Sequence, residues 1–284
     1  MPDALKSLID SNLDLVSLPD IVFRINNMVE DSSTTAADIG HVISLDTGLS
    51  IRLLKIVNSP FYGFPSEVET ISMAVTILGV RQLRDLIFMT TVIDKYSQIP
   101  SDILNPEAFW RHSIATAISA QLIAKVVKLS NNDRLFTCGM LHDIGLLIMA
   151  IAEPEKTRQV LELSINSNKP SHELQLSVFG FNQGDAGAAL IRKWNLPESF
   201  VEPIQLQQNN KPALRFPMET AIVKVASVMS NNDEDTALVG DNQIIHPGTL
   251  ELLGLDEEIL ASIQLETIEK VQQALQMLYV KKAA

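Results

Sequence analysis

The chain contains few cysteines, few backbone breakers and few basic residues. Its one cysteine, Cys138, excludes an intrachain disulfide. The 12 glycines and 13 prolines make up about 9 % of the 284 residues, against a usual ~12 %, and this scarcity favours helices. The 22 basic residues are outnumbered by 34 acidic ones, so the net charge is −12 and we expect no nucleic-acid partner.

The sequence also lacks a membrane-spanning run and a secretory leader. No apolar run reaches the ~18 residues that cross a bilayer. Residues 1–20 interrupt their apolar positions with charges and lack the basic start of a signal peptide. We therefore expect a cytoplasmic protein with no membrane partner. The 46 % hydrophobic and 20 % charged content is typical of a soluble globular chain and excludes disorder and collagen.

Apolar residues recur every three or four positions, and almost nowhere every two, which predicts an all-α protein. A single glycine, Gly79, separates two predicted helices. Residues 135–151 form an almost wholly apolar helix or helix pair, which must lie in the core. The other predicted helices cover residues 21–29, 39–43, 51–57, 71–78, 80–90, 106–129, 160–165, 174–178, 186–194, 222–229 and 259–278.

Capping residues and breakers mark several helix boundaries. Thr35 and Asp38 fit a capping box, and Asn105-Pro106-Glu107 has a cap, a preset φ and a favourable charge in order. Pro60 ends the helix before it, and residues 61–65 are predicted to form a packed turn. The polar residues 230–247 are predicted to be an exposed or mobile connection.

The segment most informative about chemistry is Leu141-His142-Asp143-Ile144-Gly145. A carboxylate among apolar residues must be paired, hydrogen-bonded or bound to a cation. Neighbouring helical residues point about 100° apart, so the tips of His142 and Asp143 meet only at a helix end or a turn, which Gly145 could supply. His112 offers a third ligand if its helix packs alongside. Such ligands suit metal-assisted hydrolysis, and a metal-free buried polar network explains them equally.

The chain resembles the HD superfamily of metal-dependent phosphohydrolases, and more closely its HDOD branch. The resemblance covers about residues 10 to 230. The matching motifs are Leu18-Pro19, Asp38-Ile39-Gly40 with Ile43, Asp46 and Leu49, Leu53-Leu54, Asn58 to Gly63, Ile77-Leu78-Gly79 with Leu83-Arg84, Phe109-Trp110-Arg111-His112, Gly139 to Gly145, and Gly187 to Pro197.

The resemblance implies that His112, His142 and Asp143 are the remaining metal ligands. Where many members carry further histidines and a distal aspartate, this chain has Gln183, Gln207-Gln208 and Ser227. Amides and hydroxyls replace imidazole and carboxylate poorly as ligands. We therefore expect no cofactor, with weak binding of a divalent ion (Mn, Fe or Mg) as the alternative. In that alternative the missing ligands would be replaced by Glu173, Asp185 or Glu202.

Five other residues are candidate contacts for a ligand or partner. Asn58 and Tyr62 lie in a predicted loop, and loops on rigid scaffolds often carry recognition, although capping and packing also explain them. Arg81, Arg84 and Arg111 could contact a phosphate or carboxylate, or could form solvated salt bridges. The remaining histidines, His41, His172 and His246, are expected at the surface or at helix caps. Both tryptophans are expected to be buried.

The sequence thus predicts an all-α HDOD bundle in two lobes, residues 1–100 and 101–230, with a helical extension at residues 248–284. The resemblance implies a non-enzymatic signalling or regulatory module that binds signalling proteins or a small signal ligand. The alternative is an enzyme, a metal-dependent phosphohydrolase or phosphodiesterase that uses His112, His142 and Asp143. The sequence leaves the oligomeric state open.

Overall fold

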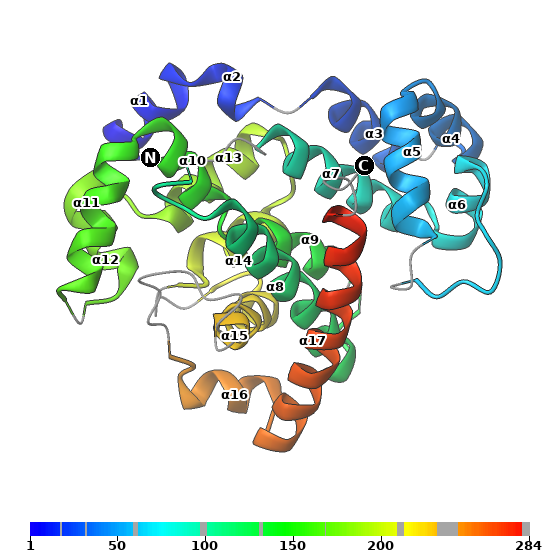
Figure 1. Cartoon of the computed structure of the whole chain (residues 1–284). Helices are drawn as coiled ribbons and strands as arrows, with labels where there is room; N and C mark the ends of the chain where they lie inside the picture. Colours follow the sequence, from blue (N-terminus) through cyan, green and yellow to red (C-terminus); the bar gives the residue numbers. More distant parts are fainter. Residues whose placement is uncertain are drawn as a thin grey trace. The chain divides into compact units, whose positions relative to one another are not determined.

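The computed structural model describes residues 1–17, 19–31, 33–58, 62–96, 101–130, 133–167, 169–208, 213–231 and 244–279. Every regular element in these ranges is a helix, which confirms the all-α prediction (Figure 1). The chain divides into two compact units. The larger comprises Met1–Ser17 with Tyr96–Thr267, and the smaller comprises Leu18–Lys95 with Ile268–Ala284.

The larger unit contains the candidate site. Its long helix α8 packs against α9 and α15, and α10 packs against α13. Its helices are α1 (Asp3–Ser11), α2 (Leu13–Val16), α8 (Pro106–Val126), α9 (Asp133–Leu141), α10 (Ile144–Ala152), α11 (Pro154–Ile165), α12 (Ser171–Phe179), α13 (Gln183–Lys193), α14 (Glu198–Leu206), α15 (Pro217–Asn231), α16 (Pro247–Leu253) and, up to Thr267, α17 (Glu257–Tyr279).

The smaller unit is a helical cluster in which α4 packs on α6 and α3 packs on α7. The predicted break at Gly79 is confirmed, because this residue has a φ of 80° between two helices. The unit contains α3 (Asp20–Glu30), α4 (Ala36–Ser44), α5 (Thr47–Val57), α6 (Ile71–Leu78), α7 (Val80–Lys95) and the end of α17.

These units differ from the predicted lobes in where the N-terminal helices belong. Residues 1–17 cluster with the larger unit because two buried side chains hold them there. The Trp194 indole N–H donates to the carbonyl of Val16 at 2.8 Å, and the Tyr96 hydroxyl donates to the carbonyl of Leu15 at 2.7 Å. The start of the predicted C-terminal extension also clusters with the larger unit, up to Thr267.

The predicted helix starts are confirmed in detail. Thr35 Oγ1 accepts from the Asp38 backbone N–H while Asp38 Oδ2 accepts from the Thr35 N–H, as a capping box requires. Asn105 Oδ1 accepts from the first backbone N–H groups of α8. Pro60 and Phe61 lie outside the described residues, as do residues 232–243 of the predicted connection.

The buried surface of α8 is wider than the single apolar stripe that the sequence predicted. Fourteen residues of this helix are buried, His112 among them, because helices cover it on several sides. Helix α17 also contacts α8, through a hydrogen bond of 3.0 Å between the buried hydroxyls of Thr267 on α17 and Ser119 on α8. Val126, which the periodicity placed on the stripe, is 44 % exposed instead.

The stretch Arg134–Ala152 has the length and composition to cross a membrane, with a hydropathy of 1.8. It covers α9 and α10, and 78 % of its most apolar window is buried inside the protein. A buried core helix meets the same criterion, and this stretch includes His142 and Asp143 of the candidate site.

Candidate metal centre

The two residues His142 and Asp143 form the turn between α9 and α10. This confirms the predicted helix pair and explains how two adjacent side chains reach the same point. Gly145 plays a different part from the predicted one. It lies inside the first turn of α10 and is not among the glycines with positive φ.

Two glycines instead allow the helices around the turn to approach closely. A Cβ on Gly139 would lie 2.6 Å from the Cα of Ala117, in the turn of α8 that follows His112. A Cβ on Gly145 would overlap the backbone carbonyl of Gln183, at the start of α13. Both contacts involve backbone, which cannot move aside as a side chain can. The glycines therefore bring α8 and α13 up to the His142–Asp143 turn.

The three predicted ligands meet at a single point. Nε2 of His112 and Nε2 of His142 are 3.0 Å apart. Oδ2 of Asp143 lies 3.2 Å from Nε2 of His142 and 3.6 Å from Nε2 of His112. All three side chains are fully buried or nearly so. Among the described residues, they are the one group of three or more His, Cys, Asp or Glu side chains close enough to share an ion.

These separations fit a metal ion. Ligand atoms placed ~2.0–2.2 Å from one ion at angles of roughly 90–110° lie about 2.8–3.6 Å apart. His142 is also oriented as a ligand, because its Nδ1 donates to the carbonyl of Gly139 at 2.7 Å and so turns Nε2 toward the other two residues. The three residues could therefore hold a single divalent ion.

The other oxygen of Asp143 is occupied by amide donors. Nε2 of Gln183 donates to Oδ1 at 2.6 Å, and Nε2 of Gln207 donates to the same oxygen at 3.4 Å. Both amides are buried. At these two positions the chain therefore presents N–H groups to the carboxylate, where an imidazole would present a lone pair to a metal.

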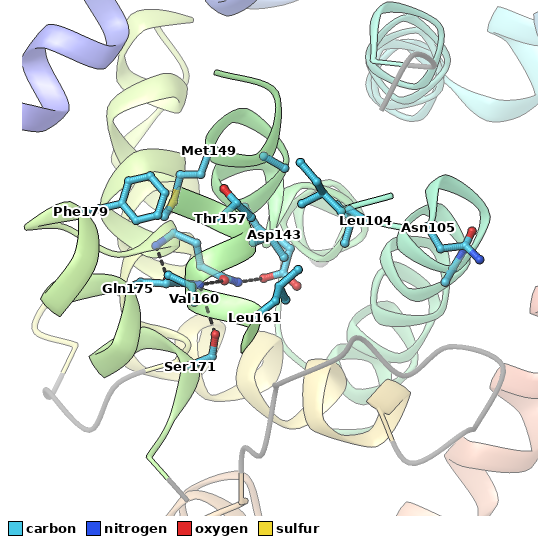
Figure 2. A pocket seen from close by; sticks show the side chains of 15 residues that line it. Leu104, Asn105, Asp143, Met149, Thr157, Val160, Leu161, Ser171, Gln175 and Phe179 are labelled. Carbon is cyan, nitrogen blue, oxygen red and sulfur yellow. Dashed lines mark hydrogen bonds between the residues drawn. The ribbon is translucent and has the colours of Figure 1, made fainter. Parts of the chain in front are cut away.

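A backbone group fixes the orientation of the Gln183 amide (Figure 2). The backbone N–H of Gln183 donates to Oε1 of Gln175 at 2.8 Å, so Gln175 turns its Nε2 toward Oε1 of Gln183, at 2.6 Å. Gln183 must then turn its own Nε2 toward Asp143. Because a backbone nitrogen can only donate, none of these bonds can be reversed alone. Periodicity gave no signal for Gln175, which enters the site from α12.

The local charges keep Asp143 ionised. Burial raises the pKa of its carboxyl, but the charges of His142 and His112 and the hydrogen bonds from His142 and Gln183 outweigh burial and lower the pKa below its usual value. These protein groups therefore favour the ionised form of the buried carboxylate.

The acidic residues proposed as replacement ligands have other roles. Asp185 caps α13 and accepts from Gln205 at 3.0 Å. Glu202 accepts from the backbone N–H of Phe216 and its two predecessors. Glu173 is exposed in the first turn of α12. The replacement hypothesis is therefore wrong for Asp185 and Glu202, whose carboxylates satisfy backbone and amide donors away from the three ligands.

The candidate contact residues are dispersed. Asn58, Tyr62, Arg81 and Arg84 belong to the smaller unit, and Arg111 belongs to the larger one. Asn58 exchanges hydrogen bonds of 2.8 and 2.6 Å with the backbone of Val68, which makes it a loop clamp. Tyr62 stacks on Phe64 with ring centroids 5.8 Å apart, and burial raises the pKa of its hydroxyl.

The three arginines differ in their surroundings. Arg84 pairs with Asp85 at 3.1 Å, and Arg111 lies 3.8 Å from Glu107 on the same helix. Arg81 is exposed. Their roles in binding remain predictions.

The remaining single-residue expectations fit the structure. His41 is exposed, His172 is half-buried and His246 accepts the Gly248 N–H as the cap of α16. The tryptophans are buried, and so is Cys138, whose thiol donates to the carbonyl of Ser199.

A pocket of about 80 Å³ lies beside Asp143, and sequence analysis did not predict it. Asp143 and Gln183 line one side of it, and aliphatic residues of α10 and α11 line much of the rest. Figure 2 shows Asp143, Thr157 and Leu161 among the labelled side chains that line the pocket. The residues come from five helices, from the loop before α8 and from the turn between α9 and α10, so no local sequence pattern predicts the pocket.

Comparison with solved structures finds proteins of similar fold, among them the following three. An HDOD domain protein of unknown function from Geobacter sulfurreducens is 22 % identical with a TM-score of 0.77, over 96 % of this chain and all of the other. A candidate phosphohydrolase from Shewanella amazonensis SB2B is 24 % identical with a TM-score of 0.74, over 97 % of each chain. A candidate signal transduction protein from Marinobacter aquaeolei VT8 is 18 % identical with a TM-score of 0.75, over 97 % of this chain and 66 % of the other. At these identities the likeness shows the fold.

Sequence comparison adds a relative and a family. An uncharacterized protein of Treponema pallidum (strain Nichols) is 29 % identical over 207 residues, which are 72 % of this chain and 39 % of the relative. The chain thus spans well under half the length of that relative. The HDOD domain model matches residues 15–210, which include all three candidate ligands. The chain belongs to the HDOD domain family.

Proposed function

We propose that this chain is a non-catalytic signal-transduction or regulatory module, which acts by binding a signalling protein or a small signal ligand. The observation that carries the proposal is the pair of amide donors on Asp143 Oδ1. They satisfy a buried carboxylate without a metal ion, in the residues that the HDOD resemblance aligns with metal ligands.

The physical argument concerns what an ion would meet. Metal-dependent hydrolysis needs enough anionic or imidazole ligands to hold the ion and an open position for water. Gln183 and Gln207 present N–H groups, whose partial positive charge opposes a cation. Turning the Gln183 amide would break its bonds to both Gln175 and Asp143, at 2.6 Å each, and leave buried polar atoms unpaired.

One observation favours a second function, that of a metal-dependent phosphohydrolase. Nε2 of His112, Nε2 of His142 and Oδ2 of Asp143 lie at separations that suit one divalent ion. The three would hold it, and the ion would lower the pKa of a bound water. The Shewanella structure described as a candidate phosphohydrolase supports the same class. The neutral residues at positions 183 and 207 argue against it.

Hydrolysis assays separate the two functions. Purified protein would be incubated with Mn²⁺, Fe²⁺ or Mg²⁺ and assayed on bis-p-nitrophenyl phosphate and on nucleotides. We expect no turnover above that of the His142→Ala variant, which lacks one ligand. Turnover that depends on the metal and disappears in His142→Ala would establish the enzyme and reject the regulatory proposal.

The proposal places the module in a bacterial cytoplasm. The buried stretch Arg134–Ala152, whose apolar side chains pack within the larger unit, supports a module that is not inserted in a membrane. Fractionation of cells that express the full-length protein would test it, and we expect the protein in the soluble fraction.

A further inference from the structure

The pocket beside Asp143 is lined mainly by apolar side chains. Nine of its fifteen described lining residues are apolar, and most of these nine are buried. The larger ones are Leu104, Leu146, Met149, Val160, Leu161 and Phe179. Small-molecule sites in proteins typically have this composition, with a few polar groups held in fixed positions.

The six polar side chains that line the pocket are already bound to other protein groups. Four of them form a row of hydrogen bonds, in the order Ser171, Gln175, Gln183 and Asp143 (Figure 2). The Thr157 hydroxyl donates to the Glu153 carbonyl, and Asn105 Oδ1 accepts from the first backbone N–H groups of α8. A polar ligand would lose its hydrogen bonds to water and find these donors and acceptors occupied, which disfavours its binding.

The charges around the pocket are likewise compensated within the protein. Asp143 is the one charged side chain among the described lining residues, and both of its oxygens have partners. Oδ1 accepts from the amides of Gln183 and Gln207, and Oδ2 lies 3.2 Å from Nε2 of His142 and 3.6 Å from Nε2 of His112. A cationic or anionic ligand would therefore give up its hydration without gaining an unpaired opposite charge.

The part of the pocket nearest the protein surface is also largely apolar. Five lining residues are exposed or half-buried, and three of them, Ala108, Leu146 and Leu161, are aliphatic. The volume of the pocket is about 80 Å³, roughly half of the ~150 Å³ in which an apolar protein cavity holds benzene. The pocket therefore has room for only a few non-hydrogen atoms.

From this arrangement we infer that the pocket binds small uncharged aliphatic molecules of roughly three to five non-hydrogen atoms. The inference rests on the proposed binding role of the module and names the class of ligand. Burial of apolar surface favours binding, because the ligand leaves water and no hydrogen bond within the protein has to break.

A titration with probes of equal size tests this inference. Protein labelled with ¹³C at its methionine methyl groups would be titrated with 2-chloropropane, acetamide, isopropylammonium chloride and sodium acetate at constant ionic strength. Met149 lines the pocket, and Met149→Leu assigns its signal. We expect this signal to shift and saturate with 2-chloropropane at a Kd of about 10 mM or tighter, and the polar and charged probes to bind at least about tenfold more weakly.

Two variants test whether the probe binds in this pocket. Ala108→Leu fills the pocket from α8 and should weaken 2-chloropropane binding at least about tenfold, whereas Ala37→Leu, the same exchange at an exposed position of α4, should leave it unchanged. Equal binding of acetamide or of either ion, a Met149 signal that 2-chloropropane does not shift, or unchanged binding in Ala108→Leu would overturn the inference. Each of these results leaves the proposed absence of hydrolysis standing, since only the turnover assay tests it.

Discussion

The side-chain amide of Gln183 donates to Oδ1 of Asp143 at 2.6 Å, across forty residues of sequence. This bond joins the start of α13 to the turn between α9 and α10 and supplies the buried carboxylate with a neutral donor. Gln175 of α12 fixes the orientation of the same amide, so Gln183 presents an N–H donor to Asp143 and not its carbonyl oxygen.

Exchange of the amides for imidazoles should create a metal site. In the double variant Gln183→His with Gln207→His, lone pairs replace two N–H donors next to the three existing ligands. We expect Mn²⁺ affinity to rise at least about tenfold over the wild type, measured by electron paramagnetic resonance of free Mn²⁺. Gln205→His is the matched control, because Gln205 lies on α14 and its amide donates to Asp185 of α13, so this exchange should leave the affinity unchanged. Equal affinities in the double variant and the wild type would contradict the role given to the amides.

Removal of the carboxylate should destabilise the larger unit strongly. Asp143→Ala leaves two buried histidines without their counter-charge and the Gln183 N–H without its acceptor. We expect a loss of about 3–5 kcal/mol in the free energy of unfolding, measured with urea. Asp102→Ala, which removes an exposed carboxylate paired with Arg158, should change it by less than about 0.5 kcal/mol. A loss below about 1 kcal/mol for Asp143→Ala would mean that the buried network contributes little.

A methyl group on Gly145 should disturb the helix contact next to the site. Its Cβ would overlap the backbone of Gln183, so α10 and α13 would have to separate. We expect Gly145→Ala to cost about 1–3 kcal/mol in thermal or urea unfolding. Gly48→Ala is the control, since its Cβ would meet nothing closer than 3.4 Å, and it should have little effect. An equally stable Gly145→Ala variant would show that the two helices can move apart freely.

Alkaline pH should weaken the attachment of the N-terminal helices. Burial raises the pKa of Tyr96, whose hydroxyl donates to the Leu15 carbonyl. The folded protein therefore holds this proton more tightly than the unfolded chain, so the contribution is fully present below pH ~10 and is lost as the pH rises toward the folded pKa. Tyr96→Phe should cost about 1 kcal/mol at pH 7 and should flatten this part of the pH profile of stability. A wild-type profile as flat as that of the variant would contradict this interpretation.

Sequence patterns predicted the helices and the His142–Asp143 pair because both signals are local, whereas the prediction for His112 depended on the packing of its helix and on the HDOD resemblance. The caps at Thr35 and Asn105 and the break at Gly79 each depend on a few neighbouring residues, and the structure confirms them. The apolar residues on both sides of His142 and Asp143 predicted that the Asp143 carboxylate is buried and needs polar partners.

The features that the sequence did not reveal depend on contacts between distant segments. Gln175 reaches Gln183 from another helix, and the residues that line the pocket come from five helices, a loop and the turn between α9 and α10. Asp185 and Glu202 looked available as ligands because nothing in their local sequence shows the backbone and amide donors that occupy them. The glycine at position 145 was expected to shape a turn, but its role is to admit a neighbouring helix.

The affinity of the wild-type protein for Mn²⁺ tests the central claim most directly. Metal-stripped full-length protein would be titrated with Mn²⁺ and the free ion followed by electron paramagnetic resonance. If amide donors have replaced metal ligands around Asp143, binding should be weak, with a Kd of roughly 0.1 mM or more, and should not raise the melting temperature. One equivalent of Mn²⁺ bound at micromolar Kd or tighter, and lost in His142→Ala, would contradict the account.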